Sequence, residues 1–380
     1  MSVDVEVVET APSAGGAPAG RGAWSLSWHG LRTVAVLELR QRVRSTRWKA
    51  ALIVWFLVVG LVTLLATGAF SILAGDEMGG ESFGGTVYSI VVGFVLFLGL
   101  LVAPTLSSGA INGDRNAGTL ATLQVTLLSP AEIVLGKLAA SWIAALAFLV
   151  ASIPFLVWAL AGGGVYWLSL LTTVLMLALV LGVVCAIGLG FSALVGKTSG
   201  SAVLTYLTIG AITAVLPIVF GLLVPVTTTT ETVRVWDIES GYTWEETKAP
   251  DCEWRTVEYE VWHSERTWWL LAPNPFVVVA DAQPLNGDPD QLAEDGNMLA
   301  MLQYGVRYAR TGDTGPFDWC SGYMGESGTD SPVEPVEVTD QLVWPWGLGF
   351  DLLLGAGGVV IAVNRLKVPT AQLPKGTRVA

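Results

Sequence analysis

Six stretches of this chain are apolar and long enough to cross a lipid bilayer, and no other feature of the sequence constrains the fold as strongly. A transmembrane helix needs about 20 consecutive, mostly apolar residues. The six stretches are Ala50–Leu73, Thr86–Leu106, Leu138–Leu160, Val165–Phe191, Ala202–Val226 and Trp344–Val363. Only 14% of the 380 residues are charged, whereas soluble domains carry about 25%. The sequence therefore predicts an all-α polytopic membrane protein with six transmembrane helices, and it argues against a soluble enzyme.

Basic residues in the loops predict how the chain is oriented in the membrane. Residues 21–49 carry seven Lys and Arg, and the loop between the first two stretches carries none. Basic residues return in the second loop, the fourth loop and the C-terminal tail: Arg115, Lys137, Lys197 and four residues within 365–380. Because cytoplasmic loops are enriched in Lys and Arg, we expect both termini to be cytoplasmic and the protein to lie in the plasma (inner) membrane.

The loop over residues 227–341 is then extracytoplasmic, and it is large enough to form a small α+β domain. It carries 22 acidic and 6 basic residues. Alternating apolar and polar residues predict strands over Glu231–Ile238 and Trp254–Trp262. Met298–Tyr308 is typical of a short amphipathic helix. We therefore expect a folded, acidic domain between the fifth and sixth transmembrane helices.

Two of the three cysteines, Cys252 and Cys320, fall in this outer loop, whereas Cys185 lies within the fourth apolar stretch. An extracytoplasmic compartment is oxidising, and this favours a disulfide between Cys252 and Cys320. The alternative is that two of three cysteines share the loop by chance.

A segment before the first apolar stretch combines apolar and basic residues. Over Leu31–Trp48, the apolar residues Val36, Leu39 and Val43 recur at helical spacing, together with the arginines Arg40, Arg42, Arg44 and Arg47. A helix of this kind lies in the headgroup plane, with its apolar stripe in the acyl boundary. The alternative is the ordinary basic flank of a first transmembrane helix.

The cytoplasmic loop 112–137, between the second and third stretches, carries signals for a short separate element. Ser129-Pro130-Ala131-Glu132 is a capping box with Pro at the first helical position, so it predicts a helix that runs into the third stretch. Upstream, Gly118 breaks the chain, and leucines then recur at helical spacing from Leu120 to Leu128. A short helix with an apolar face can lie on the bilayer or fit a groove on a cytosolic partner.

At this loop the sequence resembles a known family. Arg115-Asn-Ala-Gly-Thr-Leu120 and Leu127-Leu-Ser-Pro-Ala-Glu-Ile-Val-Leu-Gly-Lys137 are similar to the signature between the second and third spans of type-2 ABC exporter permeases. Trp268-Trp-Leu-Leu-Ala-Pro-Asn-Pro-Phe276 resembles an Asn-Pro-Phe stretch often found there, and the likeness covers about residues 30–365. Three departures stand out: Asp114-Arg115 where Glu-Arg is commoner, Ala121 for the usual Glu, and Leu127 for the usual Pro.

The resemblance implies the permease subunit of an ATP-driven exporter, with a coupling helix that docks on a separate ABC ATPase. ATP and Mg would be bound by that ATPase, so no cofactor is expected in this chain, and the permease would pair with an identical or a different permease. Besides these proteins, the expected partner is the lipid bilayer and not nucleic acid. The residues to which the ATPase-coupling role carries over are Arg115, Gly118, Thr119, Leu120, Leu128, Ser129, Pro130, Glu132, Gly136 and Lys137.

No catalytic, metal or nucleotide site is predicted from the motifs. The stretch Gly190–Thr198 has five residues between its glycines, where a phosphate loop needs four. The two histidines, His29 and His263, are expected on opposite sides of the membrane, so they cannot form a zinc site together. The only charged residue of the six stretches, Asp351, either faces a translocation path or is a solvated carboxylate near the interface.

The predicted organisation has five parts. It comprises a disordered tail (1–30), an interfacial helix with five transmembrane helices (31–226), the extracytoplasmic domain (227–341), the sixth transmembrane helix (342–364) and a second tail (365–380). The leading hypothesis is a transport subunit that is not itself an enzyme. The alternative is a membrane-anchored binding or sensory protein whose working part is 227–341, and a passive channel ranks last because no charged ring or filter-like loop is present.

Overall fold

The computed structural model describes residues 22–73, 83–119, 128–163, 165–239, 251–284, 297–312, 315–321, 331–334, 338 and 340–367. Within these residues the chain is mostly helical with one small sheet, and six helices are long and apolar enough to cross a membrane. The six apolar stretches predicted from the sequence are therefore confirmed as helices. Their ranges are Thr46–Ala69, Gly84–Asn116, Pro130–Ala161, Trp167–Leu194, Thr198–Leu222 and Trp344–Leu366.

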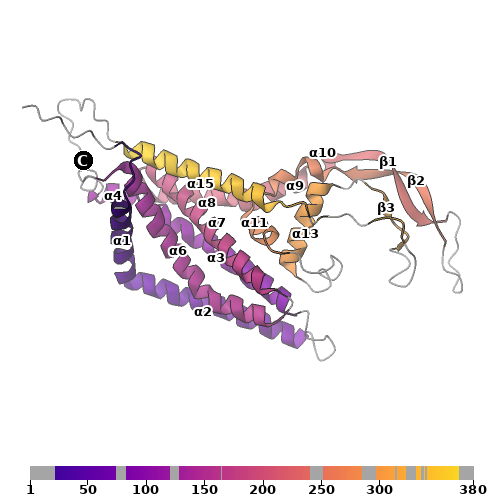
Figure 1. Ribbon diagram of the computed structural model, residues 1–380, viewed down its shortest axis with the longest axis horizontal. Helices are drawn as coiled ribbons and strands as arrows, with labels where there is room; N and C mark the ends of the chain where they lie inside the picture. Colours follow the sequence, from indigo (N-terminus) through magenta and orange to yellow (C-terminus); the bar gives the residue numbers. More distant parts are fainter. Residues whose placement is uncertain are drawn as a thin grey trace, which may run out of the picture.

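These helices form one elongated bundle (Figure 1). Its elements are α2 (Thr46–Leu73), α3 (Phe83–Ser107), α6 (Pro130–Ala161), α7 (Trp167–Leu194), α8 (Thr198–Gly210), α9 (Leu216–Leu222) and α15 (Trp344–Leu366). The helices α3 and α7 are largely buried, whereas α2 and α8 are mostly exposed. Beyond the first turn of each helix, the exposed side chains of α2 and α8 are mostly apolar, as expected for surfaces that face lipid.

The helix α15 packs closely along α7 because two glycines face each other. A Cβ atom built on Gly190 would lie 2.6 Å from the Cα atom of Gly358, so no larger residue fits at this contact. Small residues at a helix interface let the two backbones approach. Asp351 lies on the same helix and is buried at 4% exposure.

The fifth predicted stretch is not a single regular helix. A π-helical turn, η1 (Ala211–Val215), separates α8 from α9, and a short helix α10 (Val224–Thr227) follows. The N–H that would bond the Thr213 carbonyl in an α-helix belongs to residue 217, and Pro217 has none. The side-chain amide of Asn274 donates to this carbonyl instead, at 3.2 Å. A break of this kind follows from proline chemistry.

A helix α1 (Trp28–Arg44) runs across one end of the bundle, against α6 (Figure 1). It begins three residues before the predicted Leu31, because the Ser27 hydroxyl caps it by accepting from the Gly30 N–H at 3.1 Å. The expectation of disorder is wrong for residues 22–30, which pack on the start of α6. The residues of α1 that are buried are Gly30, Val34 and Ala35.

The predicted apolar stripe of α1 lies beside this buried face. Val36 and Leu39 are half-buried, and Val43 is exposed. The contact of α1 with α6 is therefore made by residues beside the predicted stripe, and no other described residue covers Val43.

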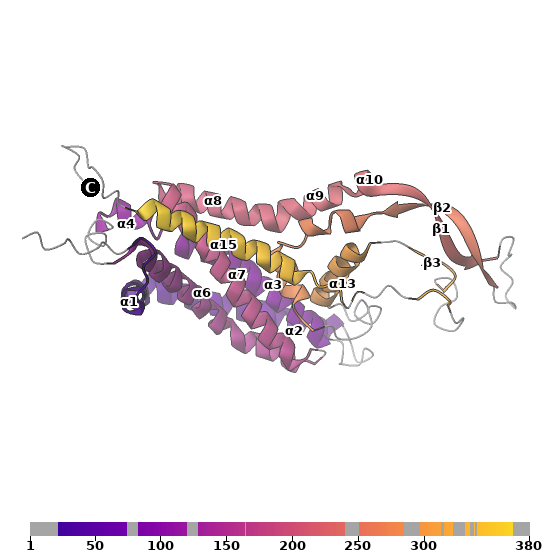
Figure 2. The same ribbon diagram turned by 45° about the horizontal axis from the view of Figure 1, so that its top comes forward.

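The small sheet lies at the opposite end of the molecule (Figure 2). Strands β1 (Thr228–Ile238) and β2 (Cys252–Trp262) form a long antiparallel ribbon, and β3 (Phe317–Asp318) pairs in parallel with β1, in the order β2-β1-β3. Both predicted strands are present, and each begins two or three residues earlier than expected. Next to the bundle lie η2 (Ser264–Arg266), η3 (Trp268–Leu270), α11 (Pro275–Asp281) and α13 (Met298–Thr311).

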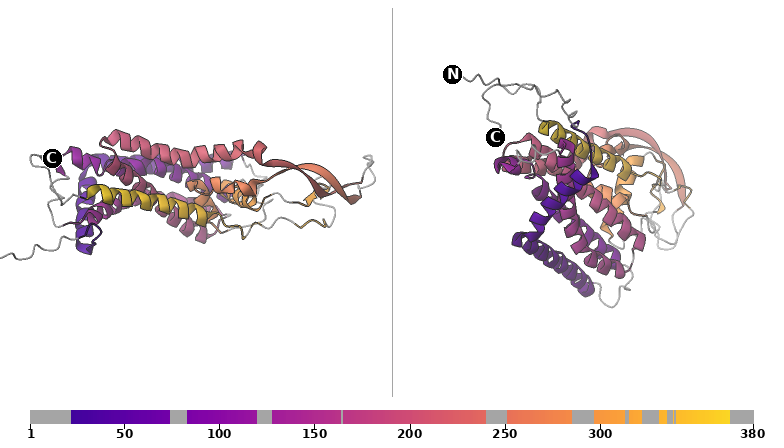
Figure 3. Two further views of the ribbon diagram at one scale, coloured as in Figure 1. Left: turned by 90° about the horizontal axis from the view of Figure 1, so that it is seen from above. Right: turned by 60° about the vertical axis from the view of Figure 1, so that its left-hand side comes forward.

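The two ends of the bundle differ in what they carry. The helix α1, the short helix α4 (Asn112–Asn116) and the last residues of α15 lie at one end, and the ribbon projects from the other (Figure 3). The described ends of the chain are therefore on the same side of the bundle. This is the relative arrangement that the loop charges predicted.

Candidate functional site

The described residues of the loop 112–137 lie at the end of the bundle that carries α1. Residues 120–127 are not among the described residues, so the predicted coupling residue Leu120 lies outside them. The rest of the loop divides into α4, an exposed turn that follows it, and the first two turns of α6. Each part has a different set of contacts.

The helix α4 is fixed to the neighbouring helices through polar contacts. The Ser192 hydroxyl of α7 accepts from the backbone N–H groups of Ile111 and Asn112, at 3.0 and 3.2 Å. The Asn112 side chain, which is fully buried, donates to the Ser201 hydroxyl of α8 at 2.9 Å and to the Val195 carbonyl at 3.3 Å. These two hydrogen bonds from the buried amide nitrogen hold α4 against α7 and α8, whereas Asn112 Oδ1 has no hydrogen-bond partner among the described residues.

The start of α6 is a complete capping box, as predicted from the sequence. The Ser129 hydroxyl accepts from the Glu132 N–H at 3.1 Å, and Glu132 Oε2 accepts from the Ser129 N–H at 2.8 Å. The second carboxylate oxygen of Glu132 accepts from the Ser27 N–H at 2.7 Å. The Ser129 hydroxyl also donates to the Ser25 carbonyl at 2.5 Å. The capping box therefore joins the segment before α1 to the start of α6.

Lys137 is the centre of a buried charge cluster. Its ammonium group, at 1% exposure, pairs with Glu38 of α1 and with Asp114 of α4, the latter at 2.5 Å. A buried cation is stable only with its counter-charges in place. One lysine therefore connects three elements: α1, α4 and α6.

Gly136, next to this lysine, lets α1 approach α6. A Cβ atom built on Gly136 would lie 2.7 Å from Val34 Cβ, closer than two carbon atoms can approach. The glycine is thus required by the packing of α1. A coupling role of Gly136 stays a prediction.

The predicted coupling residues fall into two groups. Ser129, Glu132, Gly136 and Lys137 are buried within the chain, and Leu128 and Pro130 are half-buried. Three residues are exposed, and they lie at the end of α4 and in the turn after it: Arg115, Gly118 and Thr119. Gly118 has a positive φ of 73°, which residues with a side chain rarely adopt. The exposed group is available to a partner, and the buried group holds the elements beneath it.

Sequence reasoning missed two members of the charge cluster as site residues, Glu38 and Asp114. A signal for Glu38 was present, since it is the only carboxylate among the arginines of Leu31–Trp48. Asp114 was noted only as a departure from the family pattern. Asp114 lies 23 residues and Glu38 lies 99 residues from Lys137 in the sequence, so neither pairing can be predicted from spacing.

The opposite end of the bundle is organised around the buried carboxylate of Asp281. One oxygen pairs with Arg307 of α13 at 2.5 Å, and the other accepts from the N–H groups of Val343 and Trp344, each at 2.7 Å. Asp281 thereby holds the start of α15. Upstream of Asp281, in the Asn-Pro-Phe stretch, Asn274 caps α11 by accepting from the Phe276 N–H at 2.9 Å.

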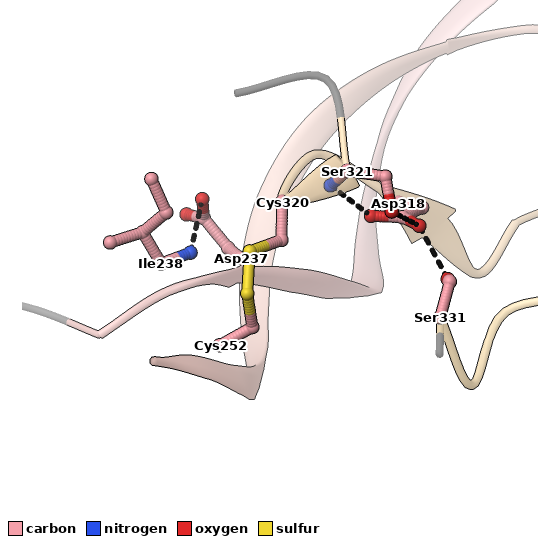
Figure 4. The surroundings of a disulfide bond; sticks show 7 residues. All are labelled: Asp237, Ile238, Cys252, Asp318, Cys320, Ser321 and Ser331. Atoms are coloured by element: carbon pink, nitrogen blue, oxygen red, sulfur yellow. Dashed lines mark hydrogen bonds between the residues drawn. A yellow bond between two sulfur atoms is a disulfide. The ribbon is translucent and has the colours of Figure 1, made fainter. Parts of the chain in front are cut away.

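The outer sheet carries the predicted cysteine pair. Cys252 and Cys320 lie at disulfide distance, with their Cα atoms 6.2 Å apart, and they join the start of β2 to the segment after β3 (Figure 4). Next to Cys320, the Asp318 carboxylate accepts from the Ser321 N–H and hydroxyl, at 2.9 and 2.6 Å, and from the Ser331 hydroxyl. Burial alone would raise the pKa of Asp318, but these hydrogen bonds from Ser321 and Ser331, with one from the Cys320 backbone, lower it below its usual value.

Asp351 does not belong to either of these clusters. It is buried inside the bundle, where the sequence left open a solvated position near the interface. No hydrogen bond joins its side chain to another of the described residues. Its suggested place on a translocation path remains a prediction.

Comparisons with known proteins identify no relative: no family model matches the chain, and no curated protein matches it. The functional argument therefore rests on the residues and contacts described above.

Proposed function

We propose that this chain is the membrane-spanning subunit of an ATP-driven exporter of the type-2 ABC permease class, powered by a separate ATPase subunit. The observation that carries the proposal is the buried pairing of Lys137 with Glu38 and Asp114. This cluster joins α1, α4 and α6, and its member Asp114 is the neighbour in α4 of the exposed Arg115, after which the exposed residues Gly118 and Thr119 follow. A force applied to that turn would move the three elements together.

The proposed orientation rests on the charges at the two ends of the bundle. Exposed arginines of α1, Arg115 of α4 and Arg365 of α15 lie at one end, and the exposed glutamates of β1 and β2 lie at the other. Because basic residues favour the cytoplasmic side, the arginine-rich end would face the cytosol of the cell whose plasma (inner) membrane holds the protein. The turn after α4 would then project toward a cytosolic partner.

In the proposed working unit, two permease subunits, identical or different, bind two ATPase subunits. ATP and Mg would be held by the ATPases, and this chain would supply no catalytic residue. Closure of the ATPase dimer would push the exposed residues Arg115, Gly118 and Thr119. Because Lys137 and Glu132 connect α6 to α1 and α4, a movement of α4 would be transmitted to α6 and α1.

The experiment that tests this proposal is ATP turnover by the assembled complex in lipid nanodiscs. Arg115→Glu and Gly118→Val change the exposed turn, and Arg365→Glu is the matched control at the same end of the bundle. We expect the first two variants to reduce turnover about tenfold or more, as for loss of a main contact of an interface, and the control to retain it. Unchanged turnover in both turn variants would contradict the proposal.

A second function, extracytoplasmic binding or sensing, is favoured by one observation. The ribbon of β1 and β2 projects from the bundle (Figure 2), and the Cys252–Cys320 pair lies at its far end, where Cys252 pairs with Ile238. This function leaves the buried cluster around Lys137 at the far end without a role. If the protein acted by extracytoplasmic binding, Arg115→Glu and Gly118→Val would not affect its function. The turnover experiment therefore also separates the two functions.

A further inference from the structure

A groove opens beside the charge cluster, in the corner between α1, α2 and the end of α3. Its volume is about 730 Å³, within the range of roughly 300–1,000 Å³ typical of small-molecule sites. One end is lined by charged residues and the other by apolar side chains of the bundle. The groove is therefore amphipathic along its length.

The charged end is formed by Arg42 of α1. Its Nη2 atom donates to the Leu106 carbonyl at 2.9 Å and to the Ser141 hydroxyl at 3.3 Å, both neutral acceptors. Its Nη1 atom is buried and has no hydrogen-bond partner among the described residues. Burial lowers the pKa of Arg42, and the nearby charge of Glu38 offsets part of this effect. The Arg42 side chain is thus half-buried, and one of its nitrogen donors is unused.

The two carboxylates that line the groove pair with Lys137 and form no ion pair with Arg42, although Glu38 is close enough to favour the charged form of Arg42. Glu38 and Asp114 are both within ion-pair distance of Lys137, and no described carboxylate lies within that distance of Arg42. Arg47, at the start of α2, lines the same end and is exposed. Arg42 and Arg47 therefore give this end of the groove two guanidinium groups without an ion-pair partner among the described residues, and such groups bind anions.

The apolar end excludes a small soluble anion as the full occupant. It is lined by Val54, Trp55 and Val58 of α2, by Leu98 of α3 and by Phe148 of α6. These side chains belong to helices apolar enough to cross a membrane, and α2 is mostly exposed. This part of the groove therefore opens toward hydrocarbon and suits an acyl chain.

We propose that the groove binds an anionic phospholipid, with its phosphate on Arg42 and an acyl chain between α2 and α3. Guanidinium groups bind phosphate through paired, charge-assisted hydrogen bonds, and Arg42 and Arg47 both line this end of the groove. A headgroup with an added ammonium would place a second cation beside Arg42 and Arg47, so the site discriminates against it. The inference depends on the helices lying in a bilayer, and it is independent of the proposed coupling to an ATPase.

Native mass spectrometry of the full-length chain in mild detergent tests this site. Phosphatidylglycerol and phosphatidylethanolamine with identical acyl chains are titrated against the wild-type chain. We expect phosphatidylglycerol to bind about tenfold more tightly, because both lipids offer the same phosphate and only phosphatidylethanolamine adds an ammonium beside the two arginines. Equal binding of the two lipids by the wild-type chain would overturn the proposal, and this comparison requires no variant.

Three variants locate the site. Arg42→Gln removes the cation and Val102→Trp fills the apolar wall, and we expect each to weaken phosphatidylglycerol binding about tenfold. Arg32→Gln, on the exposed face of α1 and outside this groove, is the control and should bind as the wild type does. If Arg42→Gln and Val102→Trp bound phosphatidylglycerol as tightly as the wild type, or if Arg32→Gln weakened its binding equally, the lipid would bind elsewhere.

Discussion

The backbone N–H of Ser27 donates a hydrogen bond of 2.7 Å to the Glu132 carboxylate, and this bond joins the start of α1 to the start of α6 across 105 residues of sequence. The same carboxylate accepts from the Ser129 N–H at 2.8 Å. Glu132 therefore satisfies two backbone donors at once. A carboxylate in this position also interacts favourably with the N-terminus of α6.

We predict that Glu132→Ala destabilises the protein more than the loss of an ordinary helix cap would. Each buried donor left without an acceptor costs roughly 1–3 kcal/mol, and this substitution leaves two. The free energy of unfolding, measured by denaturant titration in micelles, checks the prediction. Glu253→Ala, at an exposed position of β2, is the control and should change it by less than about 0.5 kcal/mol. If Glu132→Ala lowered the free energy of unfolding as little as Glu253→Ala does, the bridging role of Glu132 would be contradicted.

Lys137→Met should be among the most destabilising single substitutions at this end of the bundle. It leaves Glu38 and Asp114 in their shared site without a cation, and breaking a buried pair costs roughly 3–5 kcal/mol. Combining it with Glu38→Gln and Asp114→Asn removes the uncompensated charges, so we expect the triple variant to regain most of the stability. Lys367→Met, at an exposed position, is the control. A triple variant no more stable than the single one would show that charge pairing is not the reason for the loss.

Asn274→Ser tests the contact at the π-helical turn. A serine keeps the capping acceptor for the Phe276 N–H, but it is too short to reach the Thr213 carbonyl. The free energy of unfolding should fall by about 1–3 kcal/mol, which is the cost of a buried acceptor without its donor. Pro217→Ala restores an N–H within α9, so the same Asn274→Ser substitution should cost less in that background. Unfolding free energies of the four chains form a double-mutant cycle, and strict additivity would rule out the compensation.

Asp318 predicts a pH dependence confined to the outer sheet. Because its pKa in the folded chain lies below the ordinary value, the unfolded chain binds a proton first as the pH falls. The stabilisation is therefore fully present above the ordinary carboxyl pKa and is lost as the pH falls through the lowered one. Amide hydrogen exchange around β3, measured over this acidic range, should rise in the wild type and change much less in Asp318→Asn. An identical rise in both would assign the effect to other carboxylates.

The features that the sequence predicts well are those set by local chemistry. Apolar runs located the six long helices, and the residues Ser129, Pro130 and Glu132 located the start of α6. Alternation located both long strands, although their starts were missed because Thr228 and Cys252 carry no clear alternation signal. In each case the residues that form the element also specify it.

The contacts that sequence reasoning missed are set by packing between distant segments. Nothing near Lys137 in the sequence indicates that Glu38 and Asp114 surround it, and nothing near Ser27 indicates that Glu132 accepts from its backbone. The π-helical turn is a similar case, because Pro217 predicts a break but not that Asn274 satisfies it. The division of the coupling residues into exposed and buried groups also depends on where α1 packs.

The most direct test of the proposed function is a crosslink from the exposed turn to the partner ATPase. The chain suits this measurement, since Cys252 and Cys320 are paired and Cys185 is buried, so a cysteine introduced by Arg115→Cys is the reactive one. A short thiol-reactive crosslinker should join this position to the ATPase in the assembled complex, with a yield that changes on ATP binding. Arg365→Cys, exposed at the same end, should give little product. Absence of a crosslink at Arg115 in a complex that still hydrolyses ATP would contradict the account.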